Sequence, residues 1–371
     1  MRVGIPTEIK NNEYRVAITP AGVSELVRRG HDVVVQAGAG EGSAIHDDDF
    51  KAAGAQIIEG PDKVWAEADL LLKVKEPIEP EYSRMRKGQT LFTYLHLAAS
   101  RPCTDALLAS GTTSIAYETV QTADGALPLL APMSEVAGRL SAQVGAYHLM
   151  RTQGGRGVLM GGVPGVAPAK VVVIGGGMAG DNAAAVAWGM GAHVTVFDLN
   201  INILRKIDAE YGGAIETRYS SRLDLEDAVK QADLVIGAVL VPGAKAPKLV
   251  TNETVAQMKP GAVLVDIAID QGGCFEDSRP TTHDEPTFKV HDAVFYCVAN
   301  MPGAVPRTST YALTNATMPY VIKLAEKGWQ GACFNDPALA RGLSTHQGQL
   351  LNAEVAHDLD LPYTDPVSLL A

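Results

Sequence analysis

The sequence has few cysteines, and no two of them lie close together along the chain. Cys103, Cys274, Cys297 and Cys333 are widely separated, and no CxxC pair occurs. A disulfide framework or a structural zinc site needs paired or clustered cysteines, so both classes are excluded. We therefore expect four reduced, buried thiols, as in a cytoplasmic protein, and no metal site.

An excess of positive charge is also missing. There are 31 Lys and Arg against 42 Asp and Glu, which gives a formal net charge of −11. Proteins that bind nucleic acid need a basic surface to neutralise phosphates, so nucleic acid is not an expected partner. No stretch reaches 18 uninterrupted apolar residues and the first residues form no apolar signal core, so we expect neither a membrane partner nor secretion.

The chain is long enough for two domains, because single hydrophobic cores stop growing at about 250–300 residues. Over the first 130 residues, short apolar runs alternate with helical patterns. This alternation predicts a mostly parallel sheet with helices on its faces. The expected strands are residues 33–36, 70–74, 90–95 and 114–117.

Helix start signals support this assignment in two places. Thr19 is the expected N-cap of a helix that has Pro20 in its first turn and ends at Gly30. Asp47 is the expected N-cap of a second helix that ends at Gly54. After these, a long helix is expected at about residues 133–150.

A glycine-rich segment, GGRGVLMGGVPGVAP at residues 154–168, follows that helix. It lacks the G-x-x-x-x-G-K-[ST] pattern of a phosphate loop, so a hinge or connector is the preferred interpretation. Five apolar strands then follow, VVVIG, HVTVFD, DLVIGAV, VLVDIAI and FYCVAN, and a last helix is expected at residues 309–327. The predicted fold class is α/β with two doubly wound domains. Residues 1–130 plus 307–371 form the substrate and catalytic domain, and residues 131–306 form a Rossmann dinucleotide-binding domain with a parallel sheet.

The most specific motif is VVVIGGGMAGDNAAAVAWGMGAHVTVFD. Gly175 makes the tight turn, Gly177 lets backbone approach a pyrophosphate, and Gly180 lets helix pack on strand. The helix N-terminus then favours the anion. Asp198 ends the next strand. A carboxylate at this position accepts hydrogen bonds from the ribose hydroxyls and repels a 2′-phosphate, so NAD is preferred to NADP. The alternatives are a simple turn for the glycines and a helix N-cap for Asp198.

Further cofactor contacts are expected where the other strands end, because ligands of such sheets bind at the carboxyl ends of the strands. The candidates there are residues 220–221, 239–240, 267–270 and 298–301. Asp270 is distinctive, because it follows the apolar run VLVDIAI and precedes Gly272 and Gly273. We expect its carboxylate to lie near a nicotinamide ring.

Hydride transfer needs the substrate carbon held over that ring, its charge neutralised, and a group that exchanges a proton. The candidates are Arg15 in EYRVAITP, Lys75 in LLLKVK and His96 in TLFTYLH. Each has a structural alternative: a surface charge for Arg15, an ion pair with Glu76 for Lys75, and a structural histidine for His96. His96 is preferred as the acid/base because its pKa range suits proton transfer near neutral pH.

These motifs occur in order along the whole chain, and together the sequence resembles the bacterial alanine dehydrogenases. The resemblance implies NAD-dependent, reversible oxidative deamination of L-alanine to pyruvate and ammonium, and it leaves open a side reduction of glyoxylate. It implies that Arg15 and Lys75 bind the substrate, and that His96 and Asp270 are catalytic. It also implies a homo-hexamer. The implied NAD contacts are Ser134, Gly175, Gly177, Met178, Ala179, Gly180, Asp198, Ser220, Val239, Leu240, Ile267, Ala268, Ile269, Asp270, Arg279, Val298, Ala299, Asn300 and Met301.

One position departs from that family's pattern. Family members often carry a basic residue shortly after the ribose-binding acid, where this chain has Ile203 and a nearby Arg205. This affects the expected contacts on the adenosine side rather than the chemistry. Two other functions stay open: an NAD-binding subunit like those of the transhydrogenases, and a saccharopine-type dehydrogenase that acts on a larger amino-acid adduct.

Overall fold

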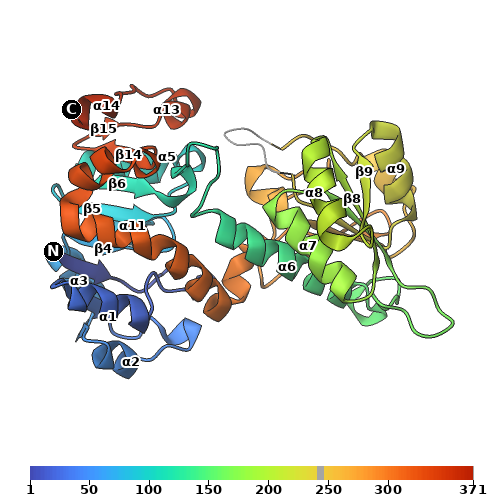
Figure 1. Cartoon of the computed structure of the whole chain (residues 1–371), viewed down its shortest axis with the longest axis horizontal. Helices are drawn as coiled ribbons and strands as arrows, with labels where there is room; N and C mark the ends of the chain where they lie inside the picture. The colour runs from blue at the N-terminus through green and yellow to red at the C-terminus, as the bar shows by residue number, and fades with distance from the viewer. Residues whose placement is uncertain (240–245, 371) are drawn as a thin grey trace. The chain divides into compact units, whose positions relative to one another are not determined.

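The computed structural model describes residues 1–239 and 246–370. The chain divides into two compact units, Met1–Met133 with Val305–Ala371, and Ser134–Ala304. Each unit is built on its own β-sheet with helices packed against it (Figure 1). Among the described residues, no helix combines the length and the apolar character that crossing a bilayer requires.

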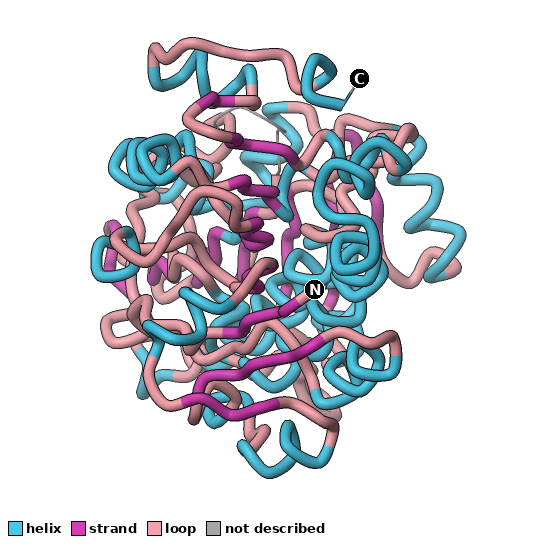
Figure 2. The backbone as a smooth tube through the Cα atoms, turned by 90° about the vertical axis from the view of Figure 1, so that its left-hand side faces the viewer, coloured by secondary structure: helices cyan, strands magenta, loops and turns pink. Residues whose placement is uncertain are grey.

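The first unit contains an eight-stranded sheet in the order β15-β14-β6-β5-β4-β1-β2-β3. Strands β1 to β6 pair in parallel, whereas β14 runs antiparallel to β6 and β15 antiparallel to β14. Figure 2 shows these strands following one another across the unit, with the C-terminal segment beyond the β15 edge. Their bounds are β1 (Arg2–Ile5), β2 (Asp32–Gln36), β3 (Gln56–Ile58), β4 (Leu70–Leu72), β5 (Thr90–Thr93), β6 (Thr113–Ala116), β14 (Leu343–His346) and β15 (Gln349–Leu350).

The chain order in this sheet reverses between β1 and β4, which lie side by side and pair in parallel. Such a switch point opens a crevice at the carboxyl ends of the strands, where ligands bind in doubly wound sheets. β4 is fully buried along its length, because helices cover both faces of a parallel sheet. Strands β1 and β3 were not expected from the sequence, and both are short.

Helix boundaries in this unit follow their capping residues. Helix α1 (Pro20–Arg28) begins as predicted, since the Thr19 side chain accepts a hydrogen bond from the Gly22 amide. The prediction for α2 (Asp47–Ala52) is wrong by one residue: His46 is its N-cap, and Asp47 instead accepts a hydrogen bond from the Gly38 amide at 2.9 Å. The other helices are α3 (Pro61–Glu67), α4 (Glu79–Tyr82), α5 (Arg101–Ser110), α11 (Pro306–Asn335), α12 (Pro337–Ala340), α13 (Ala353–Leu359) and α14 (Val367–Leu370).

The second unit contains a seven-stranded sheet in the order β12-β13-β11-β10-β7-β8-β9. All neighbours pair in parallel except β12, which is antiparallel to β13. Starting from β9, the six parallel strands have the 3-2-1-4-5-6 order of the Rossmann fold, so the predicted fold class is confirmed. The bounds are β7 (Lys170–Ile174), β8 (His193–Asp198), β9 (Glu216–Tyr219), β10 (Leu234–Gly237), β11 (Val263–Asp266), β12 (Thr287–Val290) and β13 (Ala293–Tyr296).

Strands β9 and β12 were not expected from the sequence, and a third difference concerns β11. The run VLVDIAI is not one strand: β11 ends at Asp266, and residues Ile267–Gln271 form the 3-10 turn η5. The glycine-rich segment 154–168 lies between α6 and β7 inside this unit, in agreement with its interpretation as a connector. The helices are α6 (Ala131–His148), α7 (Met178–Gly189), α8 (Ile201–Tyr211), α9 (Arg222–Gln231) and α10 (Asn252–Ala256).

Candidate active site

The glycine loop between β7 and α7 has the geometry that its three glycines predict. Gly175 adopts φ +95, a conformation that residues with a side chain rarely take, and its amide donates to the Phe197 carbonyl at 2.8 Å. A Cβ at Gly180 would lie 1.7 Å from the Gly175 carbonyl oxygen, so only glycine fits there. A Cβ at Gly177 would meet nothing within 4 Å, which leaves this side of the loop open to a ligand.

Asp198 lies beside this loop at the end of β8. Its Oδ2 accepts a hydrogen bond from the Gly176 amide at 2.7 Å, and its Oδ1 accepts one from the Asn200 amide at 2.7 Å. The N-cap of α8 is Asn200, so the alternative that Asp198 caps this helix is excluded. The half-buried Asp198 carboxylate is thus fixed at the carboxyl edge of the sheet, next to the glycine loop between β7 and α7.

The glycine loop and the start of α7 are closely packed against helices α8 and α6. A Cβ at Gly176 would lie 2.8 Å from Cγ2 of Ile203, so this isoleucine supports the loop from α8. Arg205 donates to Asn202 Oδ1 at 3.1 Å on the same helix. On the other side, a Cβ at Gly138 of α6 would lie 2.1 Å from the Ala179 carbonyl oxygen. Ser134, one of the predicted NAD contacts, lies in α6 and is the first residue of this unit.

The remaining cofactor candidates gather around the same edge of the sheet. The Ser220 amide donates to the Asp198 carbonyl at 3.0 Å. A Cβ at Gly175 would lie 3.1 Å from the Val239 amide nitrogen, so the end of β10 also approaches the loop. The predicted contact at Leu240 lies outside the described residues.

The turn η5 carries Asp270, whose side chain is exposed, and the buried Asp266 holds this turn in place. Asp266 Oδ1 accepts from the Ala268 amide at 3.1 Å, and its Oδ2 accepts from the Cys274 amide at 2.9 Å and from the Ser278 hydroxyl. Burial raises the pKa of Asp266, and the hydrogen bonds from Ser278 and Cys274 oppose that rise. The sequence prediction missed this role of Asp266, because its carboxylate binds groups at Cys274 and Ser278, which lie 8 and 12 residues further along the chain.

Residues 279–283 and 297–300 lie side by side. The Thr281 amide donates to the Cys297 carbonyl at 2.9 Å, and the Ala299 amide donates to the Thr281 carbonyl at 3.2 Å. Arg279, at the start of this pairing, places its guanidinium 4.2 Å from the centroid of the Phe288 ring. The backbone of Asn300 is left-handed, with φ +60. The segment 298–301 is therefore a shaped loop at the carboxyl end of β13.

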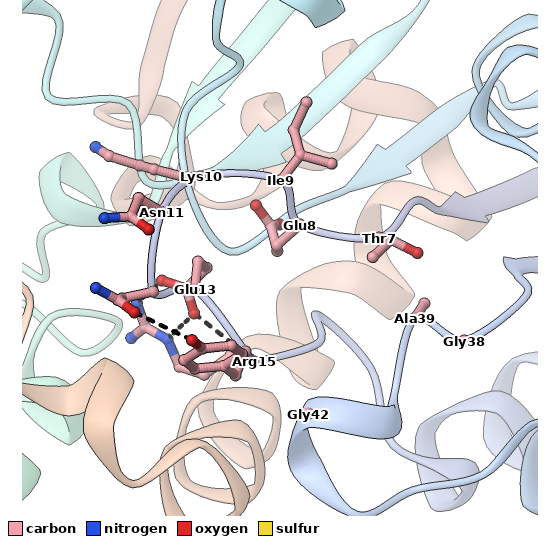
Figure 3. Close-up of a pocket in the computed structure, with 12 residues that line it drawn as sticks. Thr7, Glu8, Ile9, Lys10, Asn11, Glu13, Arg15, Gly38, Ala39 and Gly42 are labelled. Atoms are coloured by element: carbon pink, nitrogen blue, oxygen red, sulfur yellow. Dashed lines mark hydrogen bonds and ion pairs between the residues drawn. The ribbon is translucent and has the colours of Figure 1, made fainter. Parts of the chain in front are cut away.

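The first unit has a cavity of about 360 Å³ lined by residues 7–15 with Gly38, Ala39 and Gly42 (Figure 3). Arg15 contributes to its wall and is buried, so the surface-charge alternative is excluded. The Glu13 carboxylate binds the guanidinium at both Nε (2.6 Å) and Nη2 (2.5 Å), and Nη1 lies 3.0 Å from Met133 Sδ. Burial acts to lower the pKa of Arg15, but Glu13 outweighs it and the pKa is raised.

Lys75 lies beyond β4 and is also buried. Its carbonyl accepts a hydrogen bond from Thr93 Oγ1 at 3.0 Å, which ties it to the end of β5. Glu76, its suggested partner, accepts a hydrogen bond from Lys10. Burial acts to raise the pKa of Glu76, but Lys75 and Lys10 outweigh it and lower that pKa.

A buried ion triad, missed by the sequence prediction, fixes the segment that carries Lys75. The fully buried Lys73 Nζ lies 3.0 Å from Glu8 Oε2 and 2.8 Å from Glu81 Oε1. Glu8 Oε1 also accepts from the Val74 amide at 2.6 Å. The cavity wall around Glu8 is thus joined to the extension of β4.

His96 follows β5 and is half buried. Its ring stacks on that of Tyr94, with centroids 5.9 Å apart and planes 12° from parallel. The Tyr94 hydroxyl donates to the Leu129 carbonyl at 2.5 Å. In this unit, Lys75 and His96 therefore follow adjacent parallel strands, at the crevice edge of the sheet.

Comparison with known proteins decides the family. The family model "Alanine dehydrogenase/PNT, N-terminal domain" matches residues 4–137, and "Alanine dehydrogenase/PNT, C-terminal domain" matches residues 141–353. The chain belongs to the alanine dehydrogenase/PNT family. It is 84% identical to an alanine dehydrogenase of Mycolicibacterium smegmatis and 77% identical to one of Mycobacterium tuberculosis, each over 100% of both chains.

Solved structures of this family have the same architecture. An L-alanine dehydrogenase superposes with a TM-score of 0.94 at 50% identity, covering 97% of this chain and 99% of the other. A transhydrogenase from Sinorhizobium meliloti superposes with a TM-score of 0.80 at 27% identity, covering 95% and 99%. Membership of the alanine dehydrogenase/PNT family thus rests on both sequence and structure over the whole chain.

Proposed function

We propose that this chain is an NAD-dependent alanine dehydrogenase, which converts L-alanine reversibly to pyruvate and ammonium. The observation that carries the proposal is the 84% identity, over the full length of both chains, to a protein named alanine dehydrogenase. The transhydrogenase likeness is more distant, at 27% identity. It supports the alternative of an NAD-binding subunit less strongly.

The second unit fits NAD. The open side of Gly177 admits a pyrophosphate, and the fixed Asp198 carboxylate suits ribose hydroxyls while repelling a 2′-phosphate. When bound, NAD supplies the hydride acceptor. The residues proposed to hold it are Ser134, Gly175, Gly177, Met178, Ala179, Gly180, Asp198, Ser220, Val239, Leu240, Ile267, Ala268, Ile269, Asp270, Arg279, Val298, Ala299, Asn300 and Met301.

The first unit is proposed to supply two positive charges that bind the substrate and a histidine that takes up a proton. Arg15 and Lys75 are proposed to bind the substrate carboxylate and carbonyl, since both are buried cations in a protein of net charge −11. Loss of hydride from Cα and of a proton from the amine leaves an imine. Water adds to this imine while His96, assisted by Asp270, takes its proton. The resulting carbinolamine then collapses to pyruvate, with proton return to the departing ammonia.

We also propose a cytoplasmic homo-hexamer. Four buried thiols without a disulfide support a reducing compartment. The hexamer rests on the family resemblance. Light scattering on the purified protein should give the mass of six chains, and a monomer mass would contradict this.

A substrate panel tests the proposed activity. The purified protein is mixed with alanine, serine, glycine or saccharopine and NAD⁺ or NADP⁺, and in the reverse direction with pyruvate or glyoxylate, ammonium and NADH, while NADH absorbance is followed. Alanine and pyruvate with the NAD forms should react fastest. Turnover of saccharopine alone would favour the saccharopine-type alternative, and NADH binding without turnover of any substrate would favour the transhydrogenase-like subunit.

A further inference from the structure

His96 has an unusual backbone conformation for a residue with a side chain. Its φ is +47, in the left-handed region, three residues after the end of β5. Such a conformation persists in a non-glycine residue only where surrounding interactions impose it. The direction of the imidazole ring depends on this backbone turn, so whatever imposes the turn also aims the ring.

Glu118 supplies that interaction. Its Oε1 accepts hydrogen bonds from the His96 amide at 2.6 Å and from the Leu95 amide at 3.1 Å, and its Oε2 lies 3.2 Å from the Leu95 amide. Two successive amides therefore point at one carboxylate. A charged acceptor makes these bonds about twice as strong as neutral ones.

The position of Glu118 is itself fixed by buried neighbours. It lies in the 3-10 turn η3 (Tyr117–Thr119), directly after β6, and β6 pairs in parallel with β5 through Thr93 and Ala116. The adjacent Tyr117 is fully buried and packs edge-on against Tyr94, with centroids 5.0 Å apart. The same Tyr94 ring stacks on His96. Residues that follow β6 therefore hold His96 in two ways: Tyr117 packs on the Tyr94 ring that stacks on the imidazole, and Glu118 binds the His96 amide.

We propose that Glu118 is a positioning residue for His96: its carboxylate holds the left-handed turn that directs the imidazole toward the substrate. The inference rests on the proposed function, in which His96 is the acid/base. Glu118 itself touches no reacting atom. Its contribution acts through the orientation of His96, so it should alter kcat and leave cofactor affinity unchanged.

Glu118→Ala and Glu118→Gln distinguish this role from general stabilisation. The alanine variant leaves both amides without their acceptor and should lower kcat about 10- to 100-fold, because displacement of a reacting group by about 1 Å has effects of this size. The glutamine variant keeps one acceptor oxygen, which can receive both amides, and should retain much more activity. NADH affinity should match that of the wild type in both variants.

Asp124→Ala is the matched control, because Asp124 follows η3 and binds the Ala126 amide but does not contact His96. Its kcat should be unchanged. A double variant, Glu118→Ala with His96→Ala, completes the test. If Glu118 acts only through His96, the double variant should be no slower than His96→Ala alone.

Other results of these experiments would overturn either the positioning role of Glu118 or the acid/base role of His96. A wild-type kcat for Glu118→Ala, or losses that multiply in the double variant when His96→Ala is itself impaired, would overturn the positioning role and leave the proposed function intact. Full activity of His96→Ala would instead overturn the proposed acid/base, and with it this role for Glu118. A fall in NADH affinity equal to the fall in kcat would assign Glu118 to general stability.

Discussion

Arg15 and Glu13 form a buried ion pair within one short loop, with Nε 2.6 Å from Oε1 and Nη2 2.5 Å from Oε2. The Arg15 amide also donates to Glu13 Oε1 at 3.1 Å, so the carboxylate binds both the backbone and the side chain of its neighbour. A two-point contact fixes the plane of a guanidinium. The cavity wall therefore presents a cation whose orientation is set before any substrate binds.

Replacing Arg15 should consequently affect folding as well as binding. Arg15→Ala leaves Glu13 buried without its cation, a change that typically costs about 3–5 kcal/mol of unfolding free energy. Arg15→Met combined with Glu13→Gln removes both charges and should recover much of that loss while the KM for alanine stays high. Denaturant unfolding and steady-state kinetics measure the two effects. A normal KM in the double variant would remove Arg15 from substrate binding.

Asp198 should control the choice of cofactor. Asp198→Ala removes the charge that disfavours a 2′-phosphate and the acceptor for the ribose, an effect of roughly 1.5–3 kcal/mol on NAD binding. The ratio of kcat/KM for NAD to that for NADP should fall. Asp208→Ala, an exposed change on α8, serves as the control. An unaltered ratio for Asp198→Ala would reject the ribose assignment.

Alanine substitutions at Gly177 and at Gly180 should have different effects. Gly177→Ala places a methyl group in open space and should leave the melting temperature unchanged while NADH affinity falls. Gly180→Ala places one 1.7 Å from the Gly175 carbonyl and should destabilise the unit itself. Thermal melts and NADH titration separate the two outcomes. Wild-type NADH affinity in Gly177→Ala would mean that the pyrophosphate binds elsewhere.

Glu76 should contribute to stability in a pH-dependent manner. Burial opposes its ionisation, but Lys75 and Lys10 outweigh burial and hold the pKa of Glu76 below the usual 4.5. The unfolded chain therefore takes up this proton first, and the contribution is present above 4.5 and lost as pH falls below it. Between about pH 6 and about pH 4, Glu76→Gln should lose less unfolding free energy than the wild type. The exposed Glu59→Gln should behave like the wild type, and equal pH slopes for all three proteins would refute the prediction.

His96 and Asp270 should act in one proton-handling step. His96→Ala and Asp270→Asn should each lower kcat by about 10²–10⁴, as removal of a general acid or base does. Because both serve the same step, the double variant should lose much less than the product of the single losses. NADH binding by His96→Ala should remain normal. Independent, fully multiplicative losses would place the two residues in separate steps.

Features that depend on local chemistry could be predicted from the sequence alone. The glycine loop could be recognised because Gly175 and Gly180 occupy positions that a side chain would block. The helix at Thr19 and Pro20 could be recognised because capping is a contact between near neighbours. Alternation of apolar strands with helices predicted the doubly wound class, because a parallel sheet covered on both faces needs such runs.

Features that depend on partners far apart in the chain become apparent only in the folded molecule. β9 has a polar sequence and β12 alternates polar and apolar residues, so neither resembles a fully buried strand, and both are placed by pairing with neighbouring strands. The contact of Glu118 with His96 could not be predicted, because only the pairing of β5 with β6 brings its carboxylate to the His96 amide. The role of Asp266 in holding η5 could not be predicted, because its hydrogen bonds run to residues as many as 12 positions away. Candidate catalytic residues such as His96 could be proposed from the sequence one by one, but the groups that orient them are chosen by three-dimensional contact, which no local pattern encodes.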